Sequence, residues 1–223
     1  RENALAWVTT LDKGKPAAGA RVRVSDCAGK EVATGTTNIG TVVWKPVPDV
    51  SAESGPTRNQ VPGTLHFDGG EGIDTQNGLV WFTTKGDNRV WQYNTATQEI
   101  TLRLQAGGSS ILSGVDNLLV DRLGADGTLL VAEDGGDMQV VMIRPDNSLE
   151  SIVQVVGHAG SEITGPTFSP DGQRLATAAS DGLARLWSLT SVPPTLLATL
   201  PPEPLRGPPL TELAWSPDNH RLA

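Results

Sequence analysis

Three short hairpins, each with a glycine in its turn, recur along this chain at nearly constant spacing. They read VWFTTKGDNRVWQYN, LLVAEDGGDMQVVMIRP and LATAASDGLARLWSLT, and each is an apolar strand, a polar turn and a second apolar strand. Their turn glycines, Gly86, Gly135 and Gly182, lie 49 and 47 residues apart. Because four-stranded propeller blades repeat about every 40–50 residues, this spacing predicts an all-β chain with a partial β-propeller of about three blades. A plain meander or a sandwich would give similar hairpins and stays open as the alternative.

The rest of the chain divides into segments by composition. Short apolar runs bounded by Gly, Pro, Asn or Asp continue toward both ends, and no long amphipathic helical pattern interrupts them. We expect a partial β-sandwich segment over residues 1–45, propeller blades over 64–160, and further propeller strands, cut short at the C-terminal end, over 161–223. Residues 46–63 have neither periodicity nor apolar mass, so we expect a linker or surface loop there.

The charge balance and the cysteine count exclude several classes of function. The net charge of −8 and the isoelectric point near 4.8 argue against a nucleic-acid partner, since phosphate backbones need clustered Lys and Arg. The single cysteine, Cys27, allows neither an intrachain disulfide nor a cysteine zinc cluster. No run approaches the roughly 18 apolar residues of a membrane helix, so we expect no membrane partner. The chain opens at Arg1 without a signal-peptide pattern, and we expect a fragment at both ends.

The N-terminal segment carries the first of three family resemblances. The words AWVTTLDKGKPAAGA, VRVSDCAGK and GTTNIG lie within residues 4–43. In these words the segment resembles a macroglobulin-type β-sandwich domain of the bacterial alpha-2-macroglobulins. That family traps proteases through a thioester, and its Cys-Gly-Glu-Gln-type motif is absent here. The resemblance therefore implies a scaffold piece without the trapping chemistry.

The middle of the chain carries the second resemblance. PTRNQVPG, FDGGEGI, SGVDNLLV and GSEITGPTFSPDG, together with the first two hairpins, make residues 44–175 similar to the PhoX-like alkaline phosphatases, whose fold is a β-propeller. The resemblance implies hydrolysis of phosphoric monoesters, calcium and iron in a central channel, and a bacterial, extracytoplasmic (periplasmic or secreted) location. The family's iron-ligating cysteine motif is absent, and Cys27 belongs to the other segment. We therefore expect Ca²⁺ without iron, and a catalytically incomplete site.

The C-terminal segment carries the third resemblance. FSPDGQRLATAASDGLARLWSL and LAWSPDNHRLA make residues 168–223 similar to WD-repeat propeller blades, and their two SPD words begin at Ser169 and Ser216, 47 residues apart. The chain changes family across FSPDGQRL, a word that both families use, and we expect a second join near TVVWKPVPDV. We interpret the chain as a chimera, by natural recombination, sequence assembly or design.

The WD resemblance implies a structural tetrad of hydrogen-bonded side chains. His158 precedes Trp187 by 29 residues, near the separation found in a WD blade, and Ser180 and Asp181 are the candidate middle members. The usual Trp-Asp pair is Trp187-Ser188 here, which departs from the family pattern. A lone exposed histidine is the alternative interpretation of His158.

Acidic residues near strand ends are the candidate metal ligands. Glu133, Asp134 and Asp137 place three carboxylates within five residues on a hairpin turn, and hard cations such as Ca²⁺ bind several carboxylate and carbonyl oxygens. A solvated Asp-Gly turn is the alternative. The PhoX-like resemblance adds Glu71 and Asp116 as metal ligands beside Glu133 and Asp134. The alternative for Asp116 is side-chain capping of a loop.

Two basic residues in the first hairpin turn are the candidate phosphate ligands. Lys85 and Arg89 could hold a phosphate oxyanion, since Arg offers a planar fork of donors and Lys a point charge. The alternative is that they pair with Asp87 or solvate the turn.

The three resemblances lead to two hypotheses for the function. The first is a fragment or chimera of a PhoX-like, calcium-dependent phosphatase-type propeller that binds cations weakly and lacks catalysis. The second is a WD-type interaction module without enzymatic activity, which binds a protein partner or associates with itself through open β edges.

Overall fold

The hairpins that the repeat predicts lie inside three antiparallel sheets. The computed structural model describes residues 22–25, 31–35, 39–108, 110–122, 127–157, 161–200 and 213–223, so Cys27 and His158 lie outside the described residues. The described part is all-β, with one 3-10 turn at Thr57–Asn59, and none of it is a helix with the length and apolarity needed to cross a bilayer. β1 (Val22–Ser25) and β2 (Glu31–Gly35) form a two-stranded hairpin.

Each of the other sheets contains four strands that follow one another in chain order, and blade 1 has β3 as a fifth strand beside β7. Blade 1 has the order β3-β7-β6-β5-β4, blade 2 the order β11-β10-β9-β8 and blade 3 the order β12-β13-β14-β15. The strands of blade 1 are β3 (Ile39–Thr41), β4 (Gly70–Gln76), β5 (Leu79–Thr84), β6 (Arg89–Asn94) and β7 (Glu99–Gln105). Those of blade 2 are β8 (Val115–Val120), β9 (Leu129–Glu133), β10 (Gln139–Ile143) and β11 (Leu149–Gln154). Those of blade 3 are β12 (Ile163–Phe168), β13 (Arg174–Ala179), β14 (Ala184–Ser188) and β15 (Thr195–Leu200).

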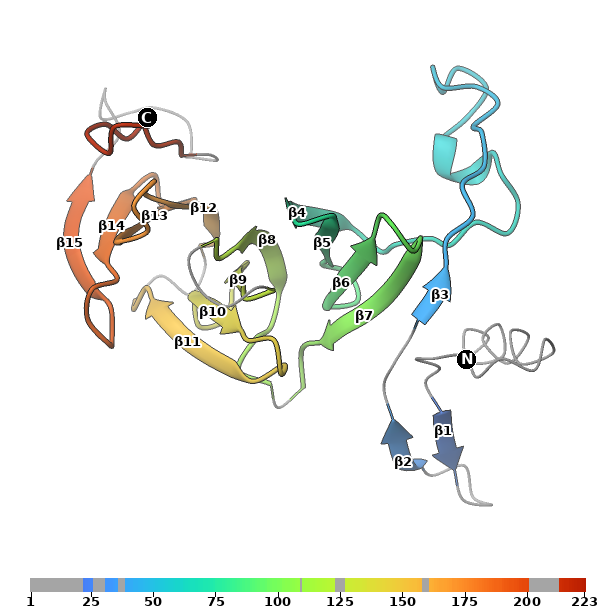
Figure 1. Cartoon of the computed structure of the whole chain (residues 1–223), viewed down its shortest axis with the longest axis horizontal. Coiled ribbons are helices and arrows are strands. Elements are labelled where there is room, and N and C mark those ends of the chain that lie inside the picture. Colours follow the sequence, from blue (N-terminus) through green and yellow to red (C-terminus); the bar gives the residue numbers. More distant parts are fainter. Residues whose placement is uncertain are drawn as a thin grey trace.

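The three sheets stand side by side around a common centre (Figure 1). The strands β4, β8 and β12 lie toward the centre, and β7, β11 and β15 lie toward the rim. β4 contacts β8, and β8 contacts β12, so the inner strands hold neighbouring blades together. This arrangement confirms the all-β class and the partial propeller of about three blades that the sequence predicts.

Two apolar clusters fill the spaces between the blades. The cluster between blades 1 and 2 contains Trp81 with Val131 and Val141, and the cluster between blades 2 and 3 contains Val140 with Trp187. Val140 and Val141 belong to different clusters because successive side chains of a strand point to opposite faces. Blade 2 is therefore buried on both faces.

The outward face of blade 1 is covered by the chain that precedes the blade. A third cluster on this face contains Trp91 and Ile100, with Val42 packed against it. The ring of Phe67 packs edge-on against Phe82 and Trp91, with centroids 5.0 and 5.4 Å apart. At the rim, β3 pairs with β7, although its residues belong to the segment expected as a sandwich. The preceding chain thus covers a face on which another blade would otherwise pack.

Blades 1 and 3 repeat the same buried hydrogen bond. Trp91 on β6 donates from Nε1 to Thr84 on β5 at 3.0 Å, and Trp187 on β14 donates from Nε1 to Thr177 on β13 at 3.1 Å. In each blade, one residue of the neighbouring strand pairs directly with the tryptophan, and the accepting threonine lies two residues after it in the sequence. The hydrogen bond fixes the register of the central strands, because a slip would leave a buried donor without an acceptor.

The same two blades repeat an ion pair beside this hydrogen bond. Arg89 pairs with Asp87 at 2.9 Å, and Arg185 pairs with Asp181 at 2.6 Å. Each arginine lies two residues before the tryptophan of its strand, and each aspartate lies in the turn between the two strands. The predicted structural role of Asp181 therefore has a counterpart in a blade outside the WD-like segment.

The predicted tetrad of blade 3 needs one correction. The acceptor for Trp187 is Thr177 and not Ser180, because Thr177 lies on β13 while Ser180 lies past the end of that strand. The hydroxyl of Ser180 instead lies 2.8 Å from that of Ser161.

The two SPD words form the same turn. Ser169 donates to Asp171 and Ser216 donates to Asp218, both at 2.6 Å. A β-bridge at Trp215 accompanies the second turn. The 47-residue repeat therefore extends beyond blade 3 as local structure.

Candidate cation site

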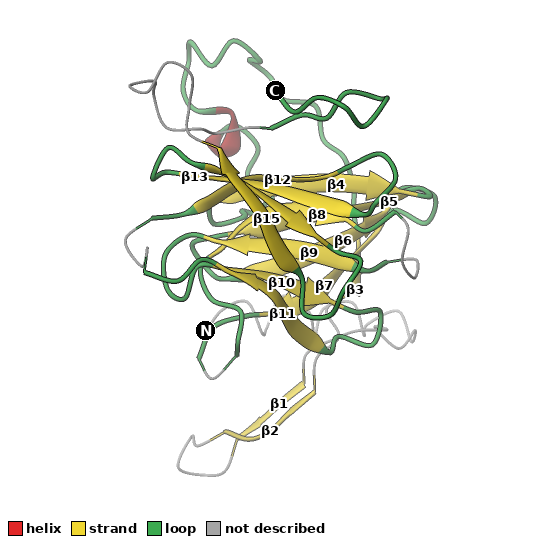
Figure 2. Ribbon diagram, turned by 90° about the vertical axis from the view of Figure 1, so that its left-hand side faces the viewer, coloured by secondary structure: helices red, strands yellow, loops and turns green. Residues whose placement is uncertain are grey.

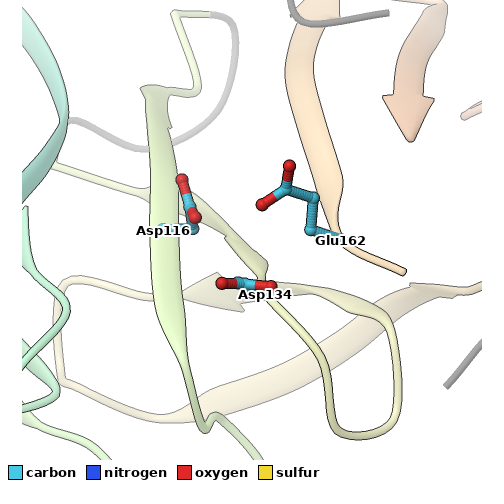
Figure 3. A group of neighbouring side chains, drawn as sticks. All are labelled: Asp116, Asp134 and Glu162. Atoms are coloured by element: carbon cyan, nitrogen blue, oxygen red, sulfur yellow. The ribbon is translucent and has the colours of Figure 1, made fainter. Parts of the chain in front are cut away.

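Three carboxylates meet where the inner strands of blades 2 and 3 approach each other. Asp116 lies on β8, Asp134 directly follows β9, and Glu162 directly precedes β12. One oxygen of each lies within 4.8 Å of the other two. Figure 3 shows the three side chains converging on one space from separate segments of the chain. Asp116 and Asp134 are two of the four predicted metal ligands, and we call the three residues the carboxylate cluster.

A backbone bridge between two blades holds the acidic pair Asp134 and Glu162 together. These residues form an isolated antiparallel β-bridge, and the N–H of Gly135 donates to the carbonyl of Ser161 at 3.1 Å. The N–H of Glu162 also donates to the hydroxyl of Ser180 at 3.2 Å. The position of Glu162 therefore follows from backbone pairing and not from attraction between side chains.

Asp116 is positioned by a close approach of β4 to β8. A Cβ atom at Gly72 would lie 2.2 Å from the backbone nitrogen of Leu118 and 2.8 Å from the carbonyl oxygen of Asp116, so only glycine fits. The hydroxyl of Thr83 donates to the same carbonyl of Asp116 at 2.5 Å and accepts the N–H of Gly72 at 2.8 Å. Contacts from blade 1 thus position the candidate ligand Asp116, which lies on blade 2.

Lys85 is the positive charge of the site. Its ammonium group pairs with Asp134 and lies 3.5 Å from Oδ2 of Asp116. The hydrogen bond to Asp134 raises the pKa of Lys85, which keeps the lysine protonated. With its three carboxylates ionised, the carboxylate cluster together with Lys85 carries a net charge of −2.

The surroundings of Glu162 oppose its ionisation. Burial raises the pKa of Glu162, and the charges of Asp134 and Asp116 raise it further, while Lys85 opposes them. The charge of Glu71 also contributes to this upward shift, so the predicted ligand Glu71 lies near the site although it is not a member of the carboxylate cluster. A bound cation would favour the ionised form of Glu162.

The predicted metal ligand Glu133 does not belong to the carboxylate cluster. Its side chain is completely buried, and its two oxygens accept the backbone N–H groups of Ser113 at 2.8 Å and Gln139 at 3.0 Å. Burial raises the pKa of Glu133. Glu133 is the last residue of β9, one residue beyond Ala132, which pairs with Val140 on β10. It is outside the carboxylate cluster because it and Asp134, being consecutive, point in different directions.

The two predicted phosphate ligands are engaged separately. Lys85 pairs with the carboxylate cluster, as given above. Arg89 pairs with Asp87 at 2.9 Å, donates from Nε to Gln105 at 2.8 Å, and lies 5.6 Å from the ring centroid of Trp91. The structure therefore supports the alternative that Arg89 pairs with Asp87.

Sequence reasoning missed Glu162, although a signal for it is present. Glu71, Asp116 and Glu162 lie 45 and 46 residues apart, so each blade has an acidic residue at or next to the start of its innermost strand. The turn glycines show nearly the same spacing. A search for the repeat among acidic residues, and not only among glycines, identifies all three.

Comparisons with known proteins find partial matches to two family models and a similar fold among solved structures. The model of the bacterial alpha-2-macroglobulin MG3 domain matches residues 1–52, and the model of the WD domain, G-beta repeat, matches residues 149–188. The first match includes the whole of the expected segment 4–43. The second runs from β11 through β14, so it begins on the outer strand of blade 2 and overlaps the expected WD-like segment only over 168–188. No curated protein matches the chain.

Solved structures that resemble the chain are larger than it is. One is a catalytically inactive virginiamycin B lyase from Staphylococcus aureus with quinupristin, at a TM-score of 0.50 and 17% identity over 68% of this chain and 47% of that one. Another is the extracellular domain of the putative one component system BT4673 from B. thetaiotaomicron, at a TM-score of 0.47 and 22% identity over 66% of this chain and 18% of that one. The chain thus spans less than half of the length of either, and the likeness to the lyase shows the fold alone.

Proposed function

We propose that this chain is the cation-binding part of a β-propeller and holds a divalent cation such as Ca²⁺ at the carboxylate cluster. The observation that carries the proposal is the convergence of Asp116, Asp134 and Glu162, whose oxygens lie within 4.8 Å of one another. Oxygens that each lie about 2.3–2.6 Å from one Ca²⁺ ion are separated by at most about 5 Å, so the spacing fits a shared ion. The net negative charge beside Lys85 adds electrostatic attraction.

Lys85 makes this binding weak. Its ammonium group already forms ion pairs with Asp134 and Asp116, so a cation must displace it or share these carboxylates with it. We therefore expect a dissociation constant of about 0.1–1 mM, the range of extracellular calcium modules. At that affinity the site would fill where Ca²⁺ is abundant, which accords with an extracytoplasmic location. The macroglobulin-type match over residues 1–52 supports the same location.

The proposed relative is a PhoX-like phosphatase propeller, and the proposed state of this chain is inactive. The resemblance of residues 44–175 supports the relationship. A hydrolytic metal centre needs a full set of ligands and an open position for the nucleophile. Arg89 is committed to Asp87 and Lys85 to the carboxylate cluster, so neither basic residue is free to hold a phosphoryl group. We expect no turnover of p-nitrophenyl phosphate above background in millimolar Ca²⁺.

Calorimetric titration with Ca²⁺ tests the proposed function. The wild type should show saturable binding of one ion, and Asp134→Asn should weaken it at least tenfold. Glu53→Gln is the matched control, because it removes one exposed carboxylate outside the carboxylate cluster. Absence of saturable heat up to about 10 mM Ca²⁺, or equal binding by wild type and Asp134→Asn, would reject the proposal, since the expected site is at least half filled at about 1 mM.

A second candidate is an interaction module of the WD type without enzymatic activity. It is favoured by the WD match over residues 149–188 and by exposed apolar side chains at the rim of blade 3. The partner would be a protein strand or surface that meets an open sheet edge. Binding of a protein partner that is unaffected by Asp134→Asn would support this candidate over the first.

A further inference from the structure

The molecule already uses strand addition at the rim of one blade. β3 pairs antiparallel with β7, with Ile39 opposite Thr101 and Thr41 opposite Glu99, and so covers the outer edge of blade 1. An outer strand otherwise presents a row of backbone N–H and C=O groups that can pair with another chain. The three blades therefore differ in how their outer edges are protected.

The outer strand of blade 3 has an irregular step in its pairing with β14 but lacks two other usual protections of an edge, charge and proline. β15 is the last strand of its sheet and reads TLLATL, with neither a charged residue nor a proline. Its leucines are largely exposed: Leu196 by 49%, Leu197 by 53% and Leu200 by 42%. Figure 2 shows β15 on the side of the molecule that faces the viewer. No strand in the part of the chain that the structure describes pairs with its outer edge.

The outer strand of blade 2, unlike β15, carries a charged residue. β11 reads LESIVQ, and its Glu150 carries a charge that is paired with Arg144. Charged residues on an edge strand oppose pairing with another chain because pairing would desolvate them. Of the outer strands β7, β11 and β15, then, one is covered by β3, one carries a charge, and only β15 is both uncharged and last in its sheet.

We propose that β15 pairs edge to edge with β15 of a second copy of this chain. The net charge of −8 makes two copies repel each other over most of their surface, so approach is least opposed where a strand carries no charge. A twofold axis would place the same strand on both sides of the contact, and the exposed leucines would then cover one another. This inference specifies the partner of the second candidate function and is independent of the cation site.

Sedimentation velocity between about 1 and 100 µM tests the proposal in the whole chain. The wild type should show a monomer–dimer equilibrium with a dissociation constant in the micromolar range typical of modest interfaces. Leu197→Lys and Thr195→Lys each place a charge on an exposed position of β15 and should raise that constant at least tenfold. Ser151→Lys, on an exposed position of β11, is the matched control and should leave it unchanged.

Thermal melts of each variant show whether it is folded, and either lysine variant suffices if the other unfolds. A chain that stays monomeric up to about 100 µM, or a dimer that both β15 variants leave intact, overturns the proposal. A dimer weakened equally by Ser151→Lys overturns it as well, because the effect would then be one of net charge. Calcium binding is unaffected by any of these outcomes, so the test does not depend on the cation site.

Discussion

Asp134 and Glu162 face each other across an isolated β-bridge between blade 2 and blade 3, so two acidic residues occupy a position where the backbone holds them together. Burial raises the pKa of Glu162, repulsion from Asp134 raises it further, and Lys85 acts in the opposite direction. Sites that keep like charges close in this way have a favourable place for a cation. Four predictions follow from the site and from the blades that position it.

Removing the charge of Glu162 should change how stability depends on pH. Because the folded state raises the pKa of Glu162, the stability that its protonation contributes is fully present below the unfolded pKa and is lost as the pH rises through the folded pKa. In EDTA, the wild type should therefore gain stability relative to Glu162→Gln as the pH falls from about 7 to about 5. Urea unfolding at several pH values measures the difference. A difference that is independent of pH contradicts the raised pKa.

Gly72→Ala should loosen the junction of blades 1 and 2. The added methyl group would overlap the backbone of Leu118 and Asp116, and backbone atoms cannot rotate away as a side chain can. We expect a loss of about 2–3 kcal/mol in the free energy of unfolding, together with weaker Ca²⁺ binding. Gly70→Ala is the control on the same strand, since a Cβ atom there has no neighbour within 4 Å. Equal urea midpoints for the two variants would show that β4 and β8 are not this close.

Thr177→Val should destabilise blade 3 by removing the acceptor for Trp187. The replacement keeps the shape of the side chain but leaves the buried indole N–H of Trp187 unpaired, which costs about 1–3 kcal/mol. Thr195→Val, on the exposed strand β15, is the matched control and should change stability by less than about 0.5 kcal/mol. Thermal or urea unfolding compares the two. If Thr177→Val lowered stability no more than Thr195→Val, the assignment of Thr177 as the acceptor would be wrong.

Glu133→Gln should lower stability and leave Ca²⁺ affinity unchanged. The carboxylate accepts two backbone N–H groups, whereas an amide can accept only one without turning its own NH₂ toward a donor. The expected loss is about 1–3 kcal/mol in the free energy of unfolding. Calorimetry on the folded variant, with Asp134→Asn as the comparison, separates this structural role from metal binding. A tenfold loss of Ca²⁺ affinity in Glu133→Gln would instead make Glu133 a ligand, as the sequence analysis expects.

Local pattern was enough to predict the blades. A hairpin is built from residues next to each other in the chain, so alternating apolar residues around Gly135 and Gly182 specify it without reference to the rest of the molecule. The repeat then predicted the number of blades, because similar hairpins that recur at one spacing pack in similar ways. The acidic hairpin turn pointed to Asp134, and the PhoX-like resemblance marked Asp116; both belong to the carboxylate cluster.

The tertiary structure decided which neighbours share a site. Glu133 and Asp134 are adjacent in sequence, yet one is buried against backbone donors and the other faces the carboxylate cluster, because strand register determines the direction of each side chain. Glu162 joins that cluster only through a bridge between two blades, and Thr177 replaces Ser180 only through the pairing of β13 with β14. By itself the sequence determined the repeating unit, since that unit is local. The site depends on contacts between units, and these exist only once the blades have packed around a common centre.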